Sequence, residues 1–253
     1  YEACLMGLYE NAYDISAFTK YIFMFSTVAW TNSASYPSYL GHANFSATTD
    51  GRGLGEIMFD VTFAAVQKPM VLSLIDSSKM NALFNAVNAW ADALQTYITP
   101  GVEVQLADAR NAAQKVDANG NNQLENLEIY IDIWSLADIM ATRGLATAQS
   151  NAVKTAVDGA VLKVNYRPAI AGVPVNYANA HGLTIYWPQL TSGSYSKYVG
   201  HQIYTSTRDG RWDDFLVAKL DVGVGKRPGL PSSYGAIEKQ SASFQIYLPM
   251  SVK

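Results

Sequence analysis

Residues 69–98, PMVLSLIDSSKMNALFNAVNAWADALQTYI, contain the most regular pattern in the chain. The first seven residues are mostly apolar and predict a buried strand at 69–75. Asp76 or Ser77 can then cap a helix, whose apolar residues recur at the spacing of one helical face over 77–98. A strand that leads directly into an amphipathic helix predicts a protein of the α/β class.

Further elements are predicted on both sides of this unit. Helical spacing indicates helices over 7–22, 55–66, 103–115, 127–142 and 145–160, and short apolar runs indicate strands over 161–166, 182–186 and 243–248. Residues 27–53 are rich in Ser, Thr, Asn, Gly and Pro and predict a long loop, which in a compact domain is usually functional. We therefore expect an α/β body over 1–190 with a mainly helical insertion at about 77–160, and a strand-rich extension over 191–253 packed on the same body.

The composition of the 253-residue chain excludes several classes of protein. Hydrophobic residues make up 49% and charged residues 15%, so a disordered chain is excluded. The formal net charge is -3 without a Lys/Arg cluster, which argues against a nucleic-acid partner. No apolar run approaches the roughly 18 residues that a membrane span needs. Because the polar surface must come from uncharged side chains, including those of 16 tyrosines, we expect a secreted or cell-surface protein.

Cys4 is the only cysteine, so it has no partner for an internal disulfide. A lone cysteine in an apolar segment is often a small buried hydrophobic residue. Here it lies between a short apolar run and the expected helix that begins at Gly7, where the partial positive charge of a helix N-terminus favours a thiolate. Cys4 is therefore a candidate nucleophile.

Five segments carry a resemblance to a known family. Residues 2–6 (EACLM) resemble the segment around the nucleophile of clostripain-like cysteine peptidases, which belong to clan CD and have the caspase-like fold. The other four follow in the family's order: 73–94 (SLIDSSKMNALFNAVNAWADAL), 130–137 (YIDIWSLA), 182–188 (GLTIYWP) and 212–216 (WDDFL). Together they extend over most of the chain, which a chance match would not do.

The resemblance implies a cysteine endopeptidase that forms a thioester through Cys4 and contributes the Cys4 backbone N–H to the oxyanion hole. It also implies a catalytic histidine in a His-Gly motif upstream of the cysteine, which would precede Tyr1. The chain starts without an initiator methionine or a signal-peptide pattern. We therefore expect it to be the nucleophile-bearing larger chain of a two-chain enzyme made from a zymogen, with an N-terminal light chain that carries the histidine as obligate partner.

Three histidines lie within the chain, His42, His181 and His201. His181-Gly182 spells the His-Gly motif, but it follows the cysteine and so has the wrong chain order for the family. Each of the three is interpreted as a loop or surface histidine, although each could in principle act as the base if no light chain supplied one.

The family's preference for Arg or Lys at the P1 position depends on an acidic residue 28 positions after its cysteine. Asn32 stands at that distance from Cys4, and an uncharged amide cannot form the charge-assisted pair that holds an arginine. Asp50 or Asp60 could supply a carboxylate from elsewhere, or the loop alignment could be shifted by a few residues. We assign Asn32 and Asp50 as candidate residues of the substrate pocket.

Residues 117–128 (DANGNNQLENLE) match most of the calcium-loop pattern D-x-[DN]-x-[DN]-G-x5-E. The candidate ligands of a structural Ca²⁺ are Asp117, Asn119, Asn121, the backbone carbonyl of Gln123, and Glu128. Asn122 stands where the pattern has glycine, and an Asn-rich polar turn without metal is the alternative. With so few carboxylates, we expect affinity near the millimolar range of extracellular calcium modules.

Two functions remain open at this point. The first is an active endopeptidase that cleaves protein or peptide substrates. The second is a non-catalytic surface or binding relative that keeps the fold and the calcium loop but has lost its base, because a fold alone does not guarantee a function. A His-Gly motif encoded upstream of Tyr1 would favour the enzyme, and its absence would favour the binding protein.

Overall fold

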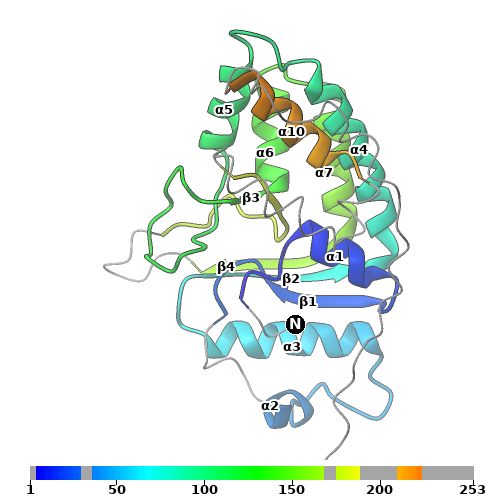
Figure 1. The fold of residues 1–253 in the computed structure, drawn as a ribbon. Coiled ribbons are helices and arrows are strands. Elements are labelled where there is room, and N and C mark those ends of the chain that lie inside the picture. Colours follow the sequence, from blue (N-terminus) through cyan, green and yellow to red (C-terminus); the bar gives the residue numbers. More distant parts are fainter. Residues whose placement is uncertain (1–3, 30–35, 168–174, 189–209, 224–253) are drawn as a thin grey trace, which may run out of the picture.

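A computed structural model of the chain describes residues 4–29, 36–167, 175–188 and 210–223, and it confirms the α/β class (Figure 1). Three strands form an antiparallel sheet in the order β1-β2-β4, namely β1 (Tyr21–Phe25), β2 (Met70–Asp76) and β4 (Val161–Arg167). Two shorter strands, β3 (Tyr130–Asp132) and β5 (Thr184–Tyr186), pair antiparallel with each other. The apolar run at 69–75 is thus the central strand β2, as predicted.

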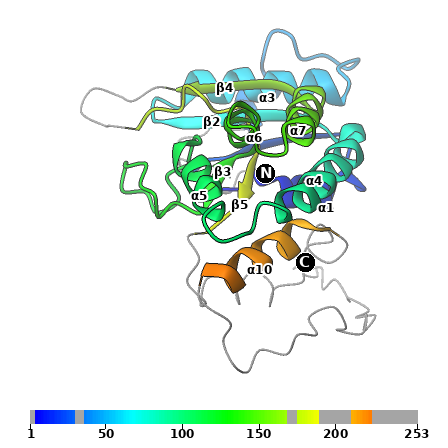
Figure 2. The same ribbon diagram turned by 90° about the horizontal axis from the view of Figure 1, so that it is seen from above.

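Helices cover both faces of the three-stranded sheet (Figure 1). One face carries α3 (Gly51–Ala65), with the short α2 (Tyr36–Leu40) beyond it. Over the other face lie α1 (Tyr9–Ser16), α4 (Met80–Gln95), α5 (Glu103–Ala112), α6 (Ile133–Thr142) and α7 (Thr147–Ala160). A 3-10 turn, η1 (Ser77–Lys79), connects β2 to α4, and α10 (Trp212–Gly223) packs against α4 on the side away from the sheet (Figure 2). Within these ranges, no helix is long and apolar enough to cross a membrane.

The alternation of side chains along β1 explains the layered arrangement. Ile22 and Met24 point into the core beneath α4 and α7, whereas Phe23 and Phe25 pack with α3 on the opposite face. All four are buried. Successive side chains of a strand point to opposite faces, so a run that is apolar throughout needs cover on both sides.

The larger core contains an aromatic cluster that joins distant parts of the chain. Trp90 of α4 stacks on Trp212 of α10 with ring centroids 5.4 Å apart, and Trp187 meets Trp212 edge to face at 5.5 Å. The indole N–H of Trp90 donates to Ser150 Oγ at 2.8 Å, and that of Trp212 donates to the Tyr186 carbonyl at 2.8 Å. The indole N–H groups of Trp90 and Trp212 therefore have partners in the core, whereas the buried indole N–H of Trp187 has none among the described residues.

One predicted helix is wrong over half of its length. The helix expected over 7–22 is α1 only from Tyr9 to Ser16, and the following apolar run is strand β1. The aromatic and branched residues of this run, YIFMF, have strand propensity, and β2 supplies a partner for all five of them. Helical spacing up to Ile22 was therefore overridden by strand pairing.

Other boundaries also differ from those predicted. The helix expected over 127–142 is strand β3 followed by α6, and Asp132 caps α6 by accepting from Ser135 N–H at 2.9 Å. The loop expected over 27–53 contains α2 and the start of α3. The predicted strands at 161–166 and 182–186 correspond to β4 and β5. In the expected strand-rich region 191–253, the described part is helix α10, and the strand at 243–248 lies outside the described residues.

A substitution at Gly7 tests the packing of the N-terminal segment against the sheet. A Cβ at Gly7 would lie 2.2 Å from Ser26 Oγ and 2.6 Å from Ser26 Cα, so the backbone itself would have to move. We expect Gly7→Ala to destabilise the fold by about 1–3 kcal/mol, the usual cost of overpacking. Urea unfolding followed by circular dichroism measures this change.

Gly159→Ala is the matched control, because Gly159 lies in α7 and a Cβ there meets no atom within 4 Å. This substitution should be neutral or stabilise by up to about 1 kcal/mol through helix propensity. Equal stability of the two variants would contradict the close contact between Gly7 and Ser26.

Candidate active site

Cys4 lies in a turn that precedes α1, and its side chain is exposed. The next residue, Leu5, has a φ of 58°, a left-handed conformation that is costly for a residue with a branched side chain. Helix α1 begins only at Tyr9, so Cys4 is not at a helix N-terminus as the sequence predicted. The field of α1 acts within about one turn of its end and does not explain a reactive thiol here.

Backbone hydrogen bonds hold the segment between Cys4 and α1 in place. Leu5 N–H donates to the Thr27 carbonyl at 2.9 Å, and Gly7 N–H donates to the Phe25 carbonyl at 2.7 Å. On the other side, the Gly7 carbonyl accepts from Thr184 N–H of β5 at 2.8 Å. The segment thus lies between the end of β1 and β5, and its position fixes where the turn with Cys4 emerges.

The sulfur of Cys4 has a backbone partner in the loop after β1. Ala29 N–H donates to Cys4 Sγ at 3.3 Å, and the Ala29 carbonyl lies 3.7 Å from the same sulfur. The sulfur therefore accepts from one backbone group of Ala29 and can donate to the other. Ala29 has no functional side chain, so no residue pattern in the sequence could have identified this contact.

The two described histidines have partners away from Cys4. His181 Nδ1 lies 3.5 Å from Asp132 Oδ1, and its ring stacks on Trp134 with centroids 3.9 Å apart. His42 Nδ1 accepts from the backbone N–H of Asn44 at 3.2 Å. Neither ring hydrogen-bonds Cys4, and His201 lies outside the described residues.

The pair of His181 and Asp132 is a titrating contact that the sequence did not indicate. Burial lowers the pKa of His181, but the hydrogen bond and the negative charge of Asp132 raise it more, so the net pKa lies above its ordinary value of 6.5. Asp132 also accepts from the backbone N–H of His181 at 2.6 Å. The protonated imidazole therefore stabilises the connection between β3 and the turn before β5.

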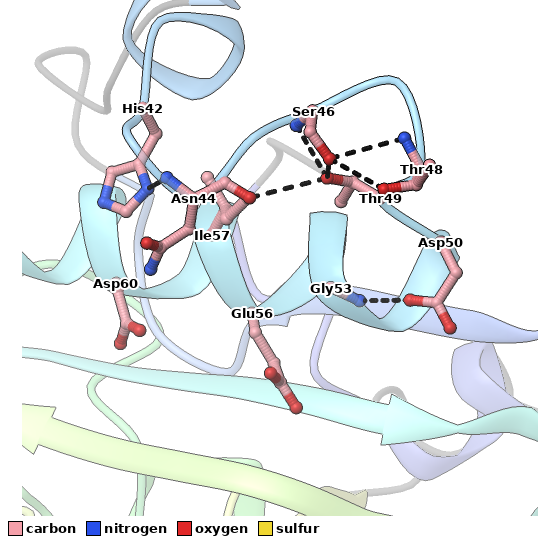
Figure 3. A pocket seen from close by; sticks show the side chains of 10 residues that line it. All are labelled: His42, Asn44, Ser46, Thr48, Thr49, Asp50, Gly53, Glu56, Ile57 and Asp60. Carbon is pink, nitrogen blue, oxygen red and sulfur yellow. Dashed lines mark hydrogen bonds between the residues drawn. The ribbon is translucent and has the colours of Figure 1, made fainter.

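The two candidate residues of the substrate pocket are not brought together. Asn32 lies outside the described residues. Asp50 caps α3 by accepting from Gly53 N–H at 2.8 Å and lines a polar pocket of about 410 Å³ together with His42, Glu56 and Asp60 (Figure 3).

The pocket of Figure 3 extends along α3, which Asp50 caps at its N-terminus. The residue after Asp50, Gly51, lies against Tyr21 at the start of β1. Cys4 lies beyond the other end of this strand, where Leu5 bonds Thr27. At about 3.3 Å per residue, the six steps along the chain from Tyr21 to Thr27 separate the two places by about 20 Å.

The predicted calcium loop adopts an ordered turn in which carboxylate and amide oxygens face backbone N–H groups. Asp117 accepts from Gly120 and Asn122 at 2.7 Å each, and Glu128 accepts from Ala118 at 2.9 Å. The loop joins α5 to β3 and not two helices as predicted. Among the described residues, no three His, Cys, Asp or Glu side chains group as a metal site, so the predicted ligand set relies on amide and carbonyl oxygens.

The candidate site is thus an exposed cysteine in a turn beside an α/β sheet that has helices on both faces. The sequence profile of the clostripain family matches residues 1–219, and the chain belongs to this family. Among the curated protein sequences, none matches the chain.

Several solved structures share the fold. A cysteine protease of B. fragilis is 17% identical with a TM-score of 0.56, over 84% of this chain and 87% of that one. A secreted C11 cysteine protease from Bacteroides thetaiotaomicron, in complex with an irreversible peptide inhibitor, is 19% identical with a TM-score of 0.56, over 84% of this chain and 58% of that one. An inactive zymogen C11 protease from Parabacteroides distasonis is 18% identical with a TM-score of 0.55, over 85% and 57%. The caspase-like fold predicted from the sequence is consistent with these matches.

A pH titration of stability tests the contact between His181 and Asp132. Because the folded-state pKa of His181 is raised, its stabilisation is fully present below the ordinary pKa of 6.5 and is lost as the pH rises through the folded-state pKa. We expect the melting temperature of the wild type to exceed that of His181→Gln at about pH 5.5, and the gap to narrow by about pH 8.5. His42→Gln is the control and should leave the pH profile unchanged. A gap between wild type and His181→Gln that stays constant across this range would contradict the assignment.

Proposed function

We propose that the chain carries the nucleophile of a cysteine endopeptidase and that Cys4 is this nucleophile. The thiolate attacks the carbonyl carbon of the scissile peptide bond, the tetrahedral intermediate expels the amine as it gains a proton, and water hydrolyses the resulting thioester. The observation that carries the proposal is the exposed sulfur of Cys4, which accepts a hydrogen bond from Ala29 N–H in a chain of the clostripain family. The Cys4 backbone N–H is proposed as one donor of the oxyanion hole.

The base in this proposal is a histidine of an N-terminal light chain from the same precursor. His181 contacts Asp132 and Trp134, and His42 bonds the backbone of Asn44, and neither ring forms a hydrogen bond with Cys4 among the described residues, which supports a base from outside this chain. A thiol at neutral pH needs a neighbouring base for efficient attack. The zymogen described for the Parabacteroides distasonis relative is in keeping with activation by processing.

The proposed location of the enzyme is extracellular. Its charged residues make up only 15% of the chain, and one relative is described as secreted. Substrates of such an enzyme are proteins or peptides outside the cell.

For the P1 side chain, we propose a weak preference for Arg and Lys. Asn32 has no charge to pair with a basic side chain, and Asp50 lies at the far end of β1 from Cys4. Asp60, the other carboxylate considered, forms an ion pair with Lys163 and so has a cationic partner already. None of the three therefore provides a free carboxylate beside the nucleophile.

Substitution of the nucleophile tests the proposed activity. Cys4→Ala in the complete processed enzyme should reduce peptide hydrolysis by about four orders of magnitude or more, because removal of a nucleophile leaves only binding and oxyanion stabilisation. The melting temperature should stay near that of the wild type. A peptidyl acyloxymethyl ketone should label Cys4, which peptide mapping by mass spectrometry identifies.

The histidine substitutions His42→Ala, His181→Gln and His201→Ala serve as controls and should retain labelling and turnover. Loss of turnover in one folded histidine variant would assign the base to this chain. An intact complex that neither cleaves peptides nor reacts at Cys4 would favour the non-catalytic binding protein.

A peptide library tests the proposed P1 preference. We expect cleavage after Arg or Lys to exceed cleavage after uncharged residues by no more than about tenfold, because a charged partner worth several kcal/mol is missing. Asn32→Asp should raise the selectivity for Arg, whereas Asp50→Asn should leave it unchanged. Strict cleavage after Arg in the wild type, lost in Asp50→Asn, would refute this proposal and assign the carboxylate to Asp50.

A further inference from the structure

A cleft of about 600 Å³ lies at the end of the sheet where β1 begins and β2 ends. Its walls come from the last turn of α1, the connection 17–20 that leads into β1, the end of β2, η1 and the first turn of α4. This volume is in the range of binding sites for small molecules. Cys4 lies beyond the other end of β1, so the cleft is separate from the candidate active site.

Ser77 provides the observation that points to a ligand in this cleft. Its backbone N–H donates to the Lys20 carbonyl at 3.0 Å, which fixes the residue against the connection before β1. Ser77 is 7% exposed, and its Oγ is buried without a hydrogen-bond partner among the described residues. A buried hydroxyl without a partner is costly. Because Ser77 lines the cleft, a ligand seated there lies beside this hydroxyl and can supply the missing bond.

Two side chains of opposite charge line the same cleft. Lys20 is exposed, and its ammonium group makes no hydrogen bond or ion pair within the described part of the chain. Asp76 Oδ1 accepts from the N–H and the hydroxyl of Ser78 at 2.9 and 2.7 Å, whereas Asp76 Oδ2 accepts from no group in the described ranges. Asp14 adds a second carboxylate from the last turn of α1. The cleft thus offers a cation to a carboxylate and carboxylates to an ammonium group.

Aromatic side chains form the apolar part of the cleft. The ring of Tyr13 stacks on that of Phe84 in α4, with centroids 4.2 Å apart and planes within 10°, which holds the Tyr13 ring in place. Tyr21 lines the cleft from the start of β1. Phe18, which is 89% exposed, belongs to the connection that forms one wall. An apolar group of a ligand therefore finds contact area close to the charged side chains.

We propose that this cleft binds a free amino acid or dipeptide with apolar side chains. Lys20 pairs with the carboxylate of the ligand, Asp76 pairs with its ammonium group, and Ser77 Oγ forms a hydrogen bond with one of these two groups. The ring of Tyr13 contacts the apolar side chain. A neutral sugar would leave both protein charges unpaired, and a simple anion or cation would leave one unpaired. The proposal does not depend on the peptidase activity of Cys4.

Isothermal titration calorimetry tests the site in the intact protein with Cys4→Ala, which leaves peptide probes uncleaved. We expect saturable binding of L-leucine or leucyl-leucine with a dissociation constant of about 1 mM or less. N-acetyl-leucyl-leucine and leucyl-leucine amide each lack one charge and should bind at least about tenfold more weakly than leucyl-leucine. Glycylglycine has both charges but no apolar side chain and should also bind more weakly. The proposal is overturned if neither leucine probe saturates below about 20 mM, or if the capped forms bind as tightly as leucyl-leucine.

Charge substitutions identify which protein group reads which end of the ligand. Lys20→Gln should bind leucyl-leucine and its amide with equal affinity, because the partner of the carboxylate is gone. Asp76→Asn should likewise bind leucyl-leucine and its N-acetyl form equally, and asparagine keeps the capping of η1. Lys79→Gln is the matched control, since Lys79 is an exposed lysine of η1 outside the cleft, and it should bind like the unsubstituted protein. Equal effects of Lys20→Gln and Lys79→Gln would overturn the assignment.

Ser77→Ala separates a ligand-binding role from a structural one. It removes a buried hydroxyl that has no partner in the described structure, so the melting temperature of the free protein should stay the same or rise. The affinity for leucyl-leucine should fall at least about threefold, because the ligand loses a hydrogen bond. Full affinity in a folded Ser77→Ala protein would contradict the proposed contact and with it the site.

Discussion

The close crossing of Gly7 and Ser26 is the constraint on which the active-site region depends. The backbone of Ser26 occupies the space that a side chain at residue 7 would need. Ser26 Oγ also donates to the Gly182 carbonyl at 3.0 Å, and Ser73 Oγ donates to the same carbonyl at 2.8 Å. The segment before α1, the end of β1, strand β2 and the turn before β5 therefore meet at one point, from which the turn with Cys4 extends.

The fold was easier to predict from the sequence than the site. The segments that carry the resemblance to the clostripain family include Trp90, Trp187 and Trp212, which stack in one core. Apolar periodicity and residue type determine such a core, and both can be read from a sequence. The strand β1 escaped prediction because its five apolar residues fit a helix or a strand equally well until β2 is placed beside them.

The chemistry around Cys4 is made largely of backbone, which a sequence does not specify. Ala29 contributes an N–H, Thr27 a carbonyl, and Leu5 an unusual φ, and none of these residue types suggests a functional role. The acidic candidate Asp50 was chosen by residue type, yet it caps α3 at the opposite end of β1. The turn at residues 117–128 was easier to predict, because its side-chain oxygens and turn residues follow a local pattern, and metal binding by this loop stays a prediction.

Two buried charged side chains, Arg110 and Asp132, hydrogen-bond backbone groups of segments that no sheet connects. Arg110 is 2% exposed, and burial lowers its pKa to about 10 although the negative charge of Glu128 opposes this. Its guanidinium holds the carbonyls of Asn126, Glu128 and Trp187, which links the end of the loop to the tryptophan core. The carboxylate of Asp132 connects two segments in a similar way, because it accepts from the backbone N–H groups of Ser135 and His181. The charge of Arg110 is thus stabilised by backbone carbonyls, whereas the charge of Asp132 is stabilised by two backbone N–H groups together with its contact to His181.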